Sequence, residues 1–156
     1  MENPSEPRLI ADVMVGRLAR WLRILGFDVL YSNRRDDDDI LRIASADRRI
    51  VLTRDRGLAA RLPADLLIFI TRDDVDSQVD EVLERLGRPQ FRVLSRCVEC
   101  NTPLEKVDKE AVFERVPPYV YLTQDEFAQC PSCLRIYWRG THASHIASKL
   151  HRWKQI

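Results

Sequence analysis

Two sets of residues in this chain have the types and spacing that metal chemistry needs. The first set consists of aspartates beside apolar runs: Asp12, Asp38 and Asp55. Carboxylates that are brought together repel one another unless a cation offsets their charge, and Mg²⁺ and Mn²⁺ prefer such oxygen ligands. An ion held in this way can activate water and neutralise charge during phosphodiester cleavage.

The choice of acid within the run Asp36–Asp39 depends on the phase of the helix that follows it. We prefer Asp38 as the metal ligand and keep Asp37 and Asp39 as alternatives. Each candidate acid also has a purely structural role open to it, because aspartates cap helix starts and lie in solvated loops. A single acid is weak evidence for a metal site, whereas three acids at one predicted edge of the sheet are stronger evidence.

Several arginines suit an anionic substrate. Residues 1–96 contain no lysine, and arginine is the better side chain for forked contacts with phosphate. The arginines that could bind substrate phosphates are Arg17, Arg20, Arg54, Arg56 and Arg139. Pairing with local acids is an equally open role for each of them.

The second set of metal-ligating residues consists of cysteines in two C-x-x-C pairs: Cys97 with Cys100, and Cys130 with Cys133. This spacing is typical of two zinc knuckles that together hold one tetrahedral ion. Four cysteine ligands leave no open coordination position, so we expect the zinc to be structural. The stretch between the pairs leaves room for a helix over 108–116.

Alternating strands and helices must position these residues. The predicted strands are 8–12, 27–31, 49–53 and 65–70, and the predicted helices are 13–26, 40–47 with the acidic run leading into it, 56–62 and 74–87. This order favours an α/β fold with a parallel sheet flanked by helices, which binds ligands at the carboxyl ends of its strands. Asp12, Asp55 and the acidic run all fall at that edge. The motif "RPQF" (88–91) is a plausible end of this domain.

The first predicted helix has a clear apolar stripe. Its spacing places Met14 on the inward face, together with leucines one and two turns later. Arg23 lies off that stripe. Gly26 stands where a left-handed helix cap is expected.

Composition places the chain among soluble globular proteins. It has 156 residues, of which 45% are hydrophobic and 31% charged, and its formal net charge is +1. No apolar run suits a membrane span and no signal-peptide pattern opens the sequence, so we expect a cytoplasmic protein. Because the net charge is near zero, affinity for nucleic acid has to come from local patches.

The final segment is basic and contains no acid. Its cations are Arg135, Arg139, Lys149, Arg152 and Lys154. Tyr137 and Trp138 could stack on bases, although aromatic residues beside a zinc site more often form its small core. We expect His142 and His145 to be solvated or to face phosphate rather than to bind a metal. The basic segment as a whole is the better candidate for contact with RNA.

Ordered motifs along the chain resemble one known family. They are "ADVMVGRLARWLRILGFDVLY", "DDDDILRIA", "RIVLTRDRGL", "RCVECNTPLEKVDKE", "VPPYVY", "TQDEF", "CPSC" and "RIYWRGTH". Over roughly residues 8–145 the chain is similar to the mutator-seven C-terminal RNase family. The resemblance implies a PIN-like nuclease domain over 8–88, a zinc ribbon over 92–140 and a basic C-terminal helix or tail over 141–156.

The same resemblance implies a divalent-metal ribonuclease with an aspartate centre. Asp12 matches the family's first acid, Asp38 the acid two residues before the apolar pair, and Asp55 the acid of the T-R-D motif. Metal-activated water would then cleave RNA and leave 5′-phosphate and 3′-hydroxyl ends, with the zinc ribbon and the basic segment positioning the RNA.

PIN nucleases often carry a fourth acid shortly after the third, and here those places hold Arg56 and Gly57. Asp73 or Asp74, after the fourth predicted strand, could substitute. Two other functions stay open. One is a non-catalytic RNA-binding or ribosome-associated adaptor with a vestigial acidic edge, and the other is a toxin-like endonuclease controlled by a regulatory protein partner.

Overall fold

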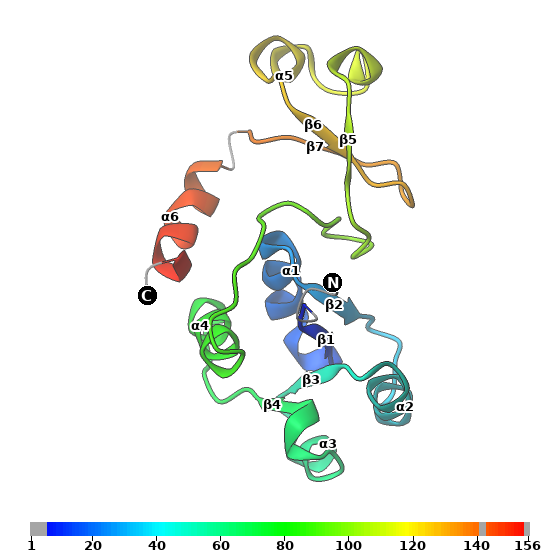
Figure 1. The fold of residues 1–156 in the computed structure, drawn as a ribbon, viewed down its shortest axis with the longest axis vertical. Helices are drawn as coiled ribbons and strands as arrows, with labels where there is room; N and C mark the ends of the chain where they lie inside the picture. Colours follow the sequence, from blue (N-terminus) through cyan, green and yellow to red (C-terminus); the bar gives the residue numbers. More distant parts are fainter. Residues whose placement is uncertain (1–5, 141–142, 155–156) are drawn as a thin grey trace, which may run out of the picture.

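The computed structural model describes residues 6–140 and 143–154. Figure 1 shows an α/β part (residues 8–88), a cysteine module (92–140) and a C-terminal helix, α6 (Ala143–Lys154). His142 and the side chain of His145 lie outside the described residues, so the expectations for these two histidines stay predictions.

Within the described residues, the α/β part contains a four-stranded parallel sheet in the order β2-β1-β3-β4. The strands are β1 (Arg8–Ala11), β2 (Asp28–Tyr31), β3 (Ile50–Thr53) and β4 (Leu67–Phe69). All four predicted strands are confirmed, and the last is shorter than predicted because Ala64–Leu66 forms a 3-10 turn, η2. The carboxyl ends of the strands meet at one edge, where Ala11 lies beside Tyr31 and Leu52.

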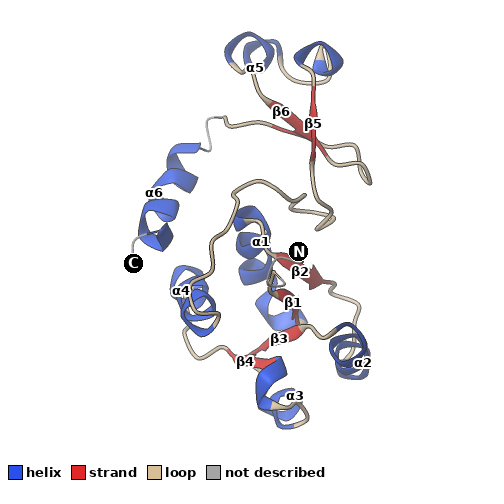
Figure 2. Cartoon of the chain, viewed as in Figure 1, coloured by secondary structure: helices blue, strands red, loops and turns tan. Residues whose placement is uncertain are grey.

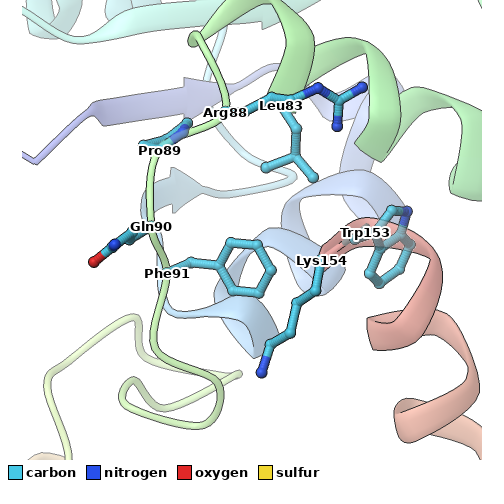
Figure 3. Close-up of a pocket in the computed structure, with 7 residues that line it drawn as sticks. All are labelled: Leu83, Arg88, Pro89, Gln90, Phe91, Trp153 and Lys154. Carbon is cyan, nitrogen blue, oxygen red and sulfur yellow. The ribbon is translucent and has the colours of Figure 1, made fainter. Parts of the chain in front are cut away.

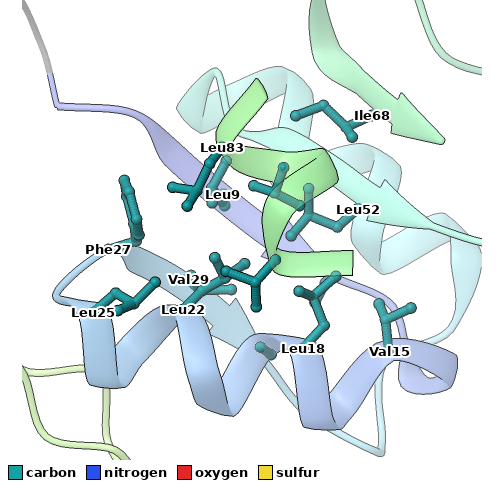
Figure 4. Close-up of a cluster of buried hydrophobic side chains, with 14 of the residues drawn as sticks. Leu9, Val15, Leu18, Leu22, Leu25, Phe27, Val29, Leu52, Ile68 and Leu83 are labelled. Carbon is teal, nitrogen blue, oxygen red and sulfur yellow. The ribbon is translucent and has the colours of Figure 1, made fainter. Parts of the chain in front are cut away.

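Helices cover both faces of this sheet, as the alternating sequence pattern predicts. They are η1 (Val13–Val15), α1 (Gly16–Leu25), α2 (Asp37–Asp47), α3 (Arg56–Ala60) and α4 (Val75–Arg85). On one face, Leu9 joins the buried cluster that α1 and α4 fill, including Leu22 (Figure 4). On the other face, Ile10 joins a cluster with Ile40 of α2 and Leu58 of α3. Neighbouring residues of a strand point to opposite faces, so both layers are built from the same short strands.

The first helix differs from its prediction at two positions. Val13–Val15 is a short 3-10 turn rather than the first turn of α1. Met14, predicted to face the core, is therefore 62% exposed, and that prediction is wrong. Arg23, predicted to lie off the apolar stripe, is only 7% exposed because the cysteine module covers it.

Gly26 ends α1, as predicted, and also allows another segment to approach the helix. Its φ of 101° is left-handed, and its amide donates to the Arg23 carbonyl oxygen. A Cβ at this position would collide with the carbonyl oxygen of Arg92. The Leu94 amide donates to the Ile24 carbonyl oxygen at 2.8 Å. The segment that leads into the cysteine module is thus held against the end of α1.

The C-terminal helix α6 packs against α1 and α4. Trp153 is fully buried, and its ring meets Trp21 edge-on with the ring centroids 5.5 Å apart. Two ion pairs join α6 to α4: Lys149 with Asp76, and Arg152 with Asp80. Two cations of the basic segment therefore hold the helix on the α/β part.

The cysteine module is mostly loop around short strands (Figure 2). Its described elements are β5 (Glu105–Val107), η3 (Lys109–Val112), α5 (Pro118–Thr123), β6 (Phe127–Gln129) and β7 (Ile136–Tyr137), with the strands antiparallel in the order β5-β6-β7. The prediction of a helix over 108–116 is wrong. Only a 3-10 turn forms there, whereas α5 begins later with Pro118, a residue suited to the first helical turn.

Candidate acidic centre and zinc site

Asp12 lies at the carboxyl edge of the sheet, directly after β1. It is 4% exposed, and its amide donates to the Leu52 carbonyl oxygen at 3.1 Å. Its Oδ1 accepts from the Met14 amide at 2.8 Å and so caps the following 3-10 turn. Its Oδ2 accepts a hydrogen bond from the Thr53 hydroxyl.

Thr53 connects Asp12 to the second acid of this edge. Its side chain is fully buried, and its Oγ1 also accepts a hydrogen bond from the Asp55 amide at 2.9 Å. Asp55 in turn caps α3, because its Oδ1 accepts from the Leu58 amide at 3.1 Å. Its Oδ2 accepts no hydrogen bond from any residue that the structure describes. Thr53 was not predicted from the sequence as a site residue, although it is the first residue of the T-R-D motif.

The structure does not bring Asp38 into the same group. Asp38 lies in the first turn of α2 with its side chain 80% exposed, and it pairs with Arg61 at 2.8 Å. Asp36 is the residue that caps α2, by accepting from the Asp39 amide. Among the described residues, four cysteines are the only histidine, cysteine or acidic side chains that gather as a metal site, with ligand atoms within 4.8 Å of one another.

Asp73 and Asp74, the two residues considered as a fourth acid, have local partners. Asp73 pairs with Arg54 at 2.7 Å. Asp74 caps α4, and the hydrogen bond from the Ser77 amide holds the pKa of its carboxyl below the usual value. The role of either residue in a metal centre stays a prediction.

The arginines predicted to bind phosphate fall into two groups. Arg17, Arg56 and Arg139 are exposed, and their side chains form no hydrogen bond or ion pair with any described residue. Arg54 pairs with Asp73 as stated above, and Arg20 pairs with Glu99 of the cysteine module at 3.1 Å. Such exposed pairs contribute little stability and exchange readily for another anion.

Tyr31 is a further residue at the acidic edge that the sequence analysis missed. It ends β2 beside Ala11, and its hydroxyl lies over the start of α1. A Cβ at Gly16 would lie 2.6 Å from that hydroxyl oxygen, so only glycine leaves room for the ring there.

The four cysteines are free thiols that converge from the two knuckles. In each knuckle an amide points at the sulfur of the first cysteine: Cys100 toward Cys97 at 3.4 Å, and Cys133 toward Cys130 at 3.5 Å. A hydrogen bond from the Arg135 amide lowers the pKa of the Cys133 thiol to about 6, whereas burial raises the pKa of the Cys100 thiol to about 12. Four thiolates at these positions fit tetrahedral zinc.

Tyr137 packs against the four-cysteine site rather than lying on an open surface. Its hydroxyl lies 3.1 Å from Cys97 Sγ and accepts from the Val98 amide at 3.1 Å. Burial raises the pKa of this hydroxyl, which keeps it a neutral donor beside the sulfur. Its neighbour Trp138 packs on the small core of the module, with its ring 6.4 Å from that of Phe127.

Buried polar contacts join the first knuckle to the α/β part. The Arg23 guanidinium donates to the Val29 carbonyl oxygen at 2.9 Å and to the Val98 and Glu99 carbonyl oxygens at 3.0 and 3.2 Å. One arginine of α1 therefore binds the outer strand β2 and the loop between Cys97 and Cys100 at the same time.

Asn101 makes the second contact across this junction. Its Oδ1 accepts from the Val29 amide at 3.0 Å, and its Nδ2 donates to Asp28 at 2.8 Å. Asp28 also binds Arg49 at 2.8 Å. Burial alone would raise the pKa of Asp28, but the hydrogen bonds from Arg49 and Asn101 outweigh it and hold this pKa below its usual value. The knuckle thus covers the edge of the sheet that β2 forms, whereas β4 forms the other edge.

A family model described as the Mut7-C RNAse domain matches residues 7–150. The chain belongs to this family. The match confirms the resemblance in the sequence motifs, and a Mut7-C RNase domain points to a nuclease or RNA-related function with RNA as its substrate. No curated protein and no solved structure matches the chain.

The helices of this Mut7-C chain are short and amphipathic. Across residues 6–140 and 143–154, none is both long enough and apolar enough to cross a membrane.

Proposed function

We propose that this chain is a divalent-metal-dependent ribonuclease with a PIN-like nuclease domain. The observation that supports it best is the link from Asp12 through Thr53 to Asp55, at the carboxyl edge of a parallel sheet in a Mut7-C RNase domain. Ligands bind at this edge in sheets of this kind. A buried carboxylate held by two donors is already oriented for a further ligand.

The donor set suits Mg²⁺ or Mn²⁺, since every candidate ligand is a carboxylate oxygen. Asp12 keeps acceptor capacity because an ionised carboxylate has about four lone-pair sites, and Asp55 Oδ2 accepts nothing from the described residues. Asp38 would complete the set by exchanging Arg61 for the ion. When bound, such an ion supplies water of lowered pKa and neutralises charge on the scissile phosphate.

The chain's own residues would orient the substrate. Thr53 fixes the Asp12 carboxylate and the backbone of Asp55. Arg17 and Arg56, which have no partner among the described residues, would bind phosphates directly. Arg20 and Arg54 would do so after exchanging their exposed acidic partners, and Arg139 would act from the cysteine module. The products would carry 5′-phosphate and 3′-hydroxyl ends.

The four cysteines would hold a structural zinc ion. Because Arg23 and Asn101 bind the first knuckle to β2, the ion would also stabilise the edge of the α/β part. The zinc ribbon over 92–140 would position the RNA near the acidic edge. We place this function in the cytoplasm, in line with the sequence.

A second candidate function is supported by the local roles of the acids. Asp12 and Asp55 cap helices, and Asp38 pairs with Arg61. These contacts would suffice for an RNA-binding or ribosome-associated adaptor that holds no divalent ion. A toxin-like nuclease under the control of a protein partner would share the acidic centre, but its overexpression would stop growth.

A cleavage assay separates these functions. Zinc-loaded protein is incubated with end-labelled structured and single-stranded RNA in Mg²⁺, in Mn²⁺ and with a chelator. Asp12→Asn should abolish cleavage and retain RNA binding, whereas Asp65→Asn, which removes an exposed acid paired only with Arg48, should cleave like the unchanged protein. Equal and metal-independent behaviour of all three proteins would favour the adaptor.

A further inference from the structure

A large groove separates the α/β part from the cysteine module, at the edge of the sheet opposite to Asp12. It has a volume of about 820 Å³. One wall is formed by the end of α1 and the start of β2, and another by segment 90–96 and the strands of the module. We infer that this groove binds a single-stranded segment of the RNA substrate, an inference that rests on the proposed function.

The charges in the groove suit an RNA backbone. Four of its cations, Arg92, Lys106, Arg139 and Lys154, form no hydrogen bond or ion pair with any described residue through their side chains. Two acids, Glu6 and Glu126, also line it without such partners, and they leave the positive charge in excess. The acid Asp28 lies at the groove but is bound to Arg49 and Asn101. Cations that line a groove without protein partners can bind the phosphates of an RNA backbone.

The half-buried aromatic rings of Trp138 and Phe91 also line the groove. Trp138 is half-buried and lines the groove, and its indole nitrogen lies only 2.5 Å from where a Cβ of Gly140 would be, so the ring is held against its own backbone. A smaller pocket of about 250 Å³ adjoins the groove beneath α6. Figure 3 shows the Phe91 ring and the Lys154 side chain next to each other in this pocket. A ring beside a cation can stack on a base of any identity.

Helix α1 connects the acidic edge of the sheet to the groove. Helix α1 starts next to Asp12 and ends at Gly26, which lines the groove. Its ten residues span about 15 Å at 1.5 Å per residue. A stacked strand carries one phosphate per 3.4 Å or so, and this distance therefore corresponds to about four nucleotides. Arg17 and Arg20 lie on α1 between the two sites. The substrate would thus be an RNA with a single-stranded extension several nucleotides long beside the cleavage site.

Paired charge reversals test this inference. The full, zinc-loaded chain carries Asp12→Asn so that binding is measured without cleavage. Into it we introduce either Arg92→Glu with Lys106→Glu, both in the groove, or Arg48→Glu with Arg85→Glu, both exposed outside it. The two pairs change net charge equally. A fluorescent single-stranded RNA of twelve nucleotides and a polyglutamate peptide of equal charge are the probes.

The groove pair should weaken RNA binding at least tenfold near 0.1 M salt. It should also reduce the slope of log affinity against log salt by about 1.4, the value for two lost phosphate contacts. The control pair should stay within threefold of the parent. Equal losses for both pairs, or no loss for either, would overturn the inference, and so would polyglutamate binding as tight as that of RNA.

The same proteins distinguish failure of this inference from failure of the proposed function. If the catalytically intact chain cleaves RNA with a metal but the groove pair leaves binding unchanged, the groove inference is wrong and the nuclease stands. If the groove pair loses binding and the intact chain never cleaves, the groove is supported and the nuclease is wrong.

Discussion

The buried Thr53 hydroxyl donates a hydrogen bond to Asp12 Oδ2, and its oxygen accepts a hydrogen bond from the Asp55 amide. No water can replace this donor without a change in packing, because Thr53 is fully buried. We predict that Thr53→Val lowers the rate of metal-dependent cleavage at least tenfold. Loss of an outer partner of a metal ligand typically costs about 10–100-fold in metal affinity or activity.

Thr53→Ser is the matched control, since serine keeps the hydroxyl and removes only a methyl group. It should retain most of the activity. Comparing the Mn²⁺ concentration for half-maximal cleavage among the three proteins separates a positioning role from loss of fold. If the valine and serine variants lose activity equally while both stay folded, the hydroxyl does not position Asp12.

The junction between Asn101 and β2 gives a second prediction. Asn101→Gly removes the acceptor for the Val29 amide and the donor to Asp28, while glycine tolerates the φ of 65° at this position. We expect the free energy of unfolding of the zinc-loaded protein to fall by about 1–3 kcal/mol, the cost of leaving a buried polar group unpaired.

Glu114→Gly controls for the entropy of an added glycine, because Glu114 is exposed and also has a φ of 65°. Urea unfolding should show little loss for this control. Hydrogen exchange at the Val29 amide should accelerate only in Asn101→Gly. Unchanged exchange there would mean that the knuckle does not protect the edge of the sheet.

Asp28 gives a prediction that depends on pH. In the folded protein its pKa lies below the ordinary value of 3.8, because Arg49 and Asn101 bind the charged form. The stabilisation is therefore fully present above the unfolded pKa and is lost as the pH falls through the folded pKa. At pH 7, Asp28→Asn should lower the free energy of unfolding by about 1.5–3 kcal/mol, the range for hydrogen bonds to charged groups.

The difference in free energy of unfolding between the two proteins should be constant from pH 7 to about pH 5 and should shrink below about pH 4. Both proteins carry the same cysteines, so the loss of zinc in acid affects them alike. A difference that grows as the pH falls would contradict the assigned contacts of Asp28.

Local sequence patterns predicted the strands, most of the helices, the cysteine pairs and the helix cap at Gly26, because each of these depends on residues close together in the chain. Strand and helix periodicity placed Asp12 and Asp55 at the same edge of the sheet, and the C-x-x-C spacing identified the four cysteines that converge. The left-handed cap at Gly26 was also readable, because few residues other than glycine favour that conformation.

Contacts between distant segments could not be read in this way. Arg23 appeared to be a surface residue of α1, since nothing near it in the sequence indicates that residues 98 and 99 cover it. The same holds for Trp153, which is buried only because α6 folds back onto α1. Asp38 was preferred as a metal ligand although the sequence does not fix which way each residue in the first turn of α2 points. In the structure its side chain pairs with Arg61.

The most direct test of the nuclease assignment is a time course of RNA cleavage by the zinc-loaded protein and its Asp12→Asn variant in Mn²⁺, with analysis of the product ends. We predict that only the unchanged protein cleaves, that a chelator suppresses this cleavage, that the products carry 5′-phosphate and 3′-hydroxyl ends, and that both proteins bind RNA equally. Equal cleavage by both proteins, or intact RNA in both, would contradict the assignment of Asp12 to a catalytic metal centre.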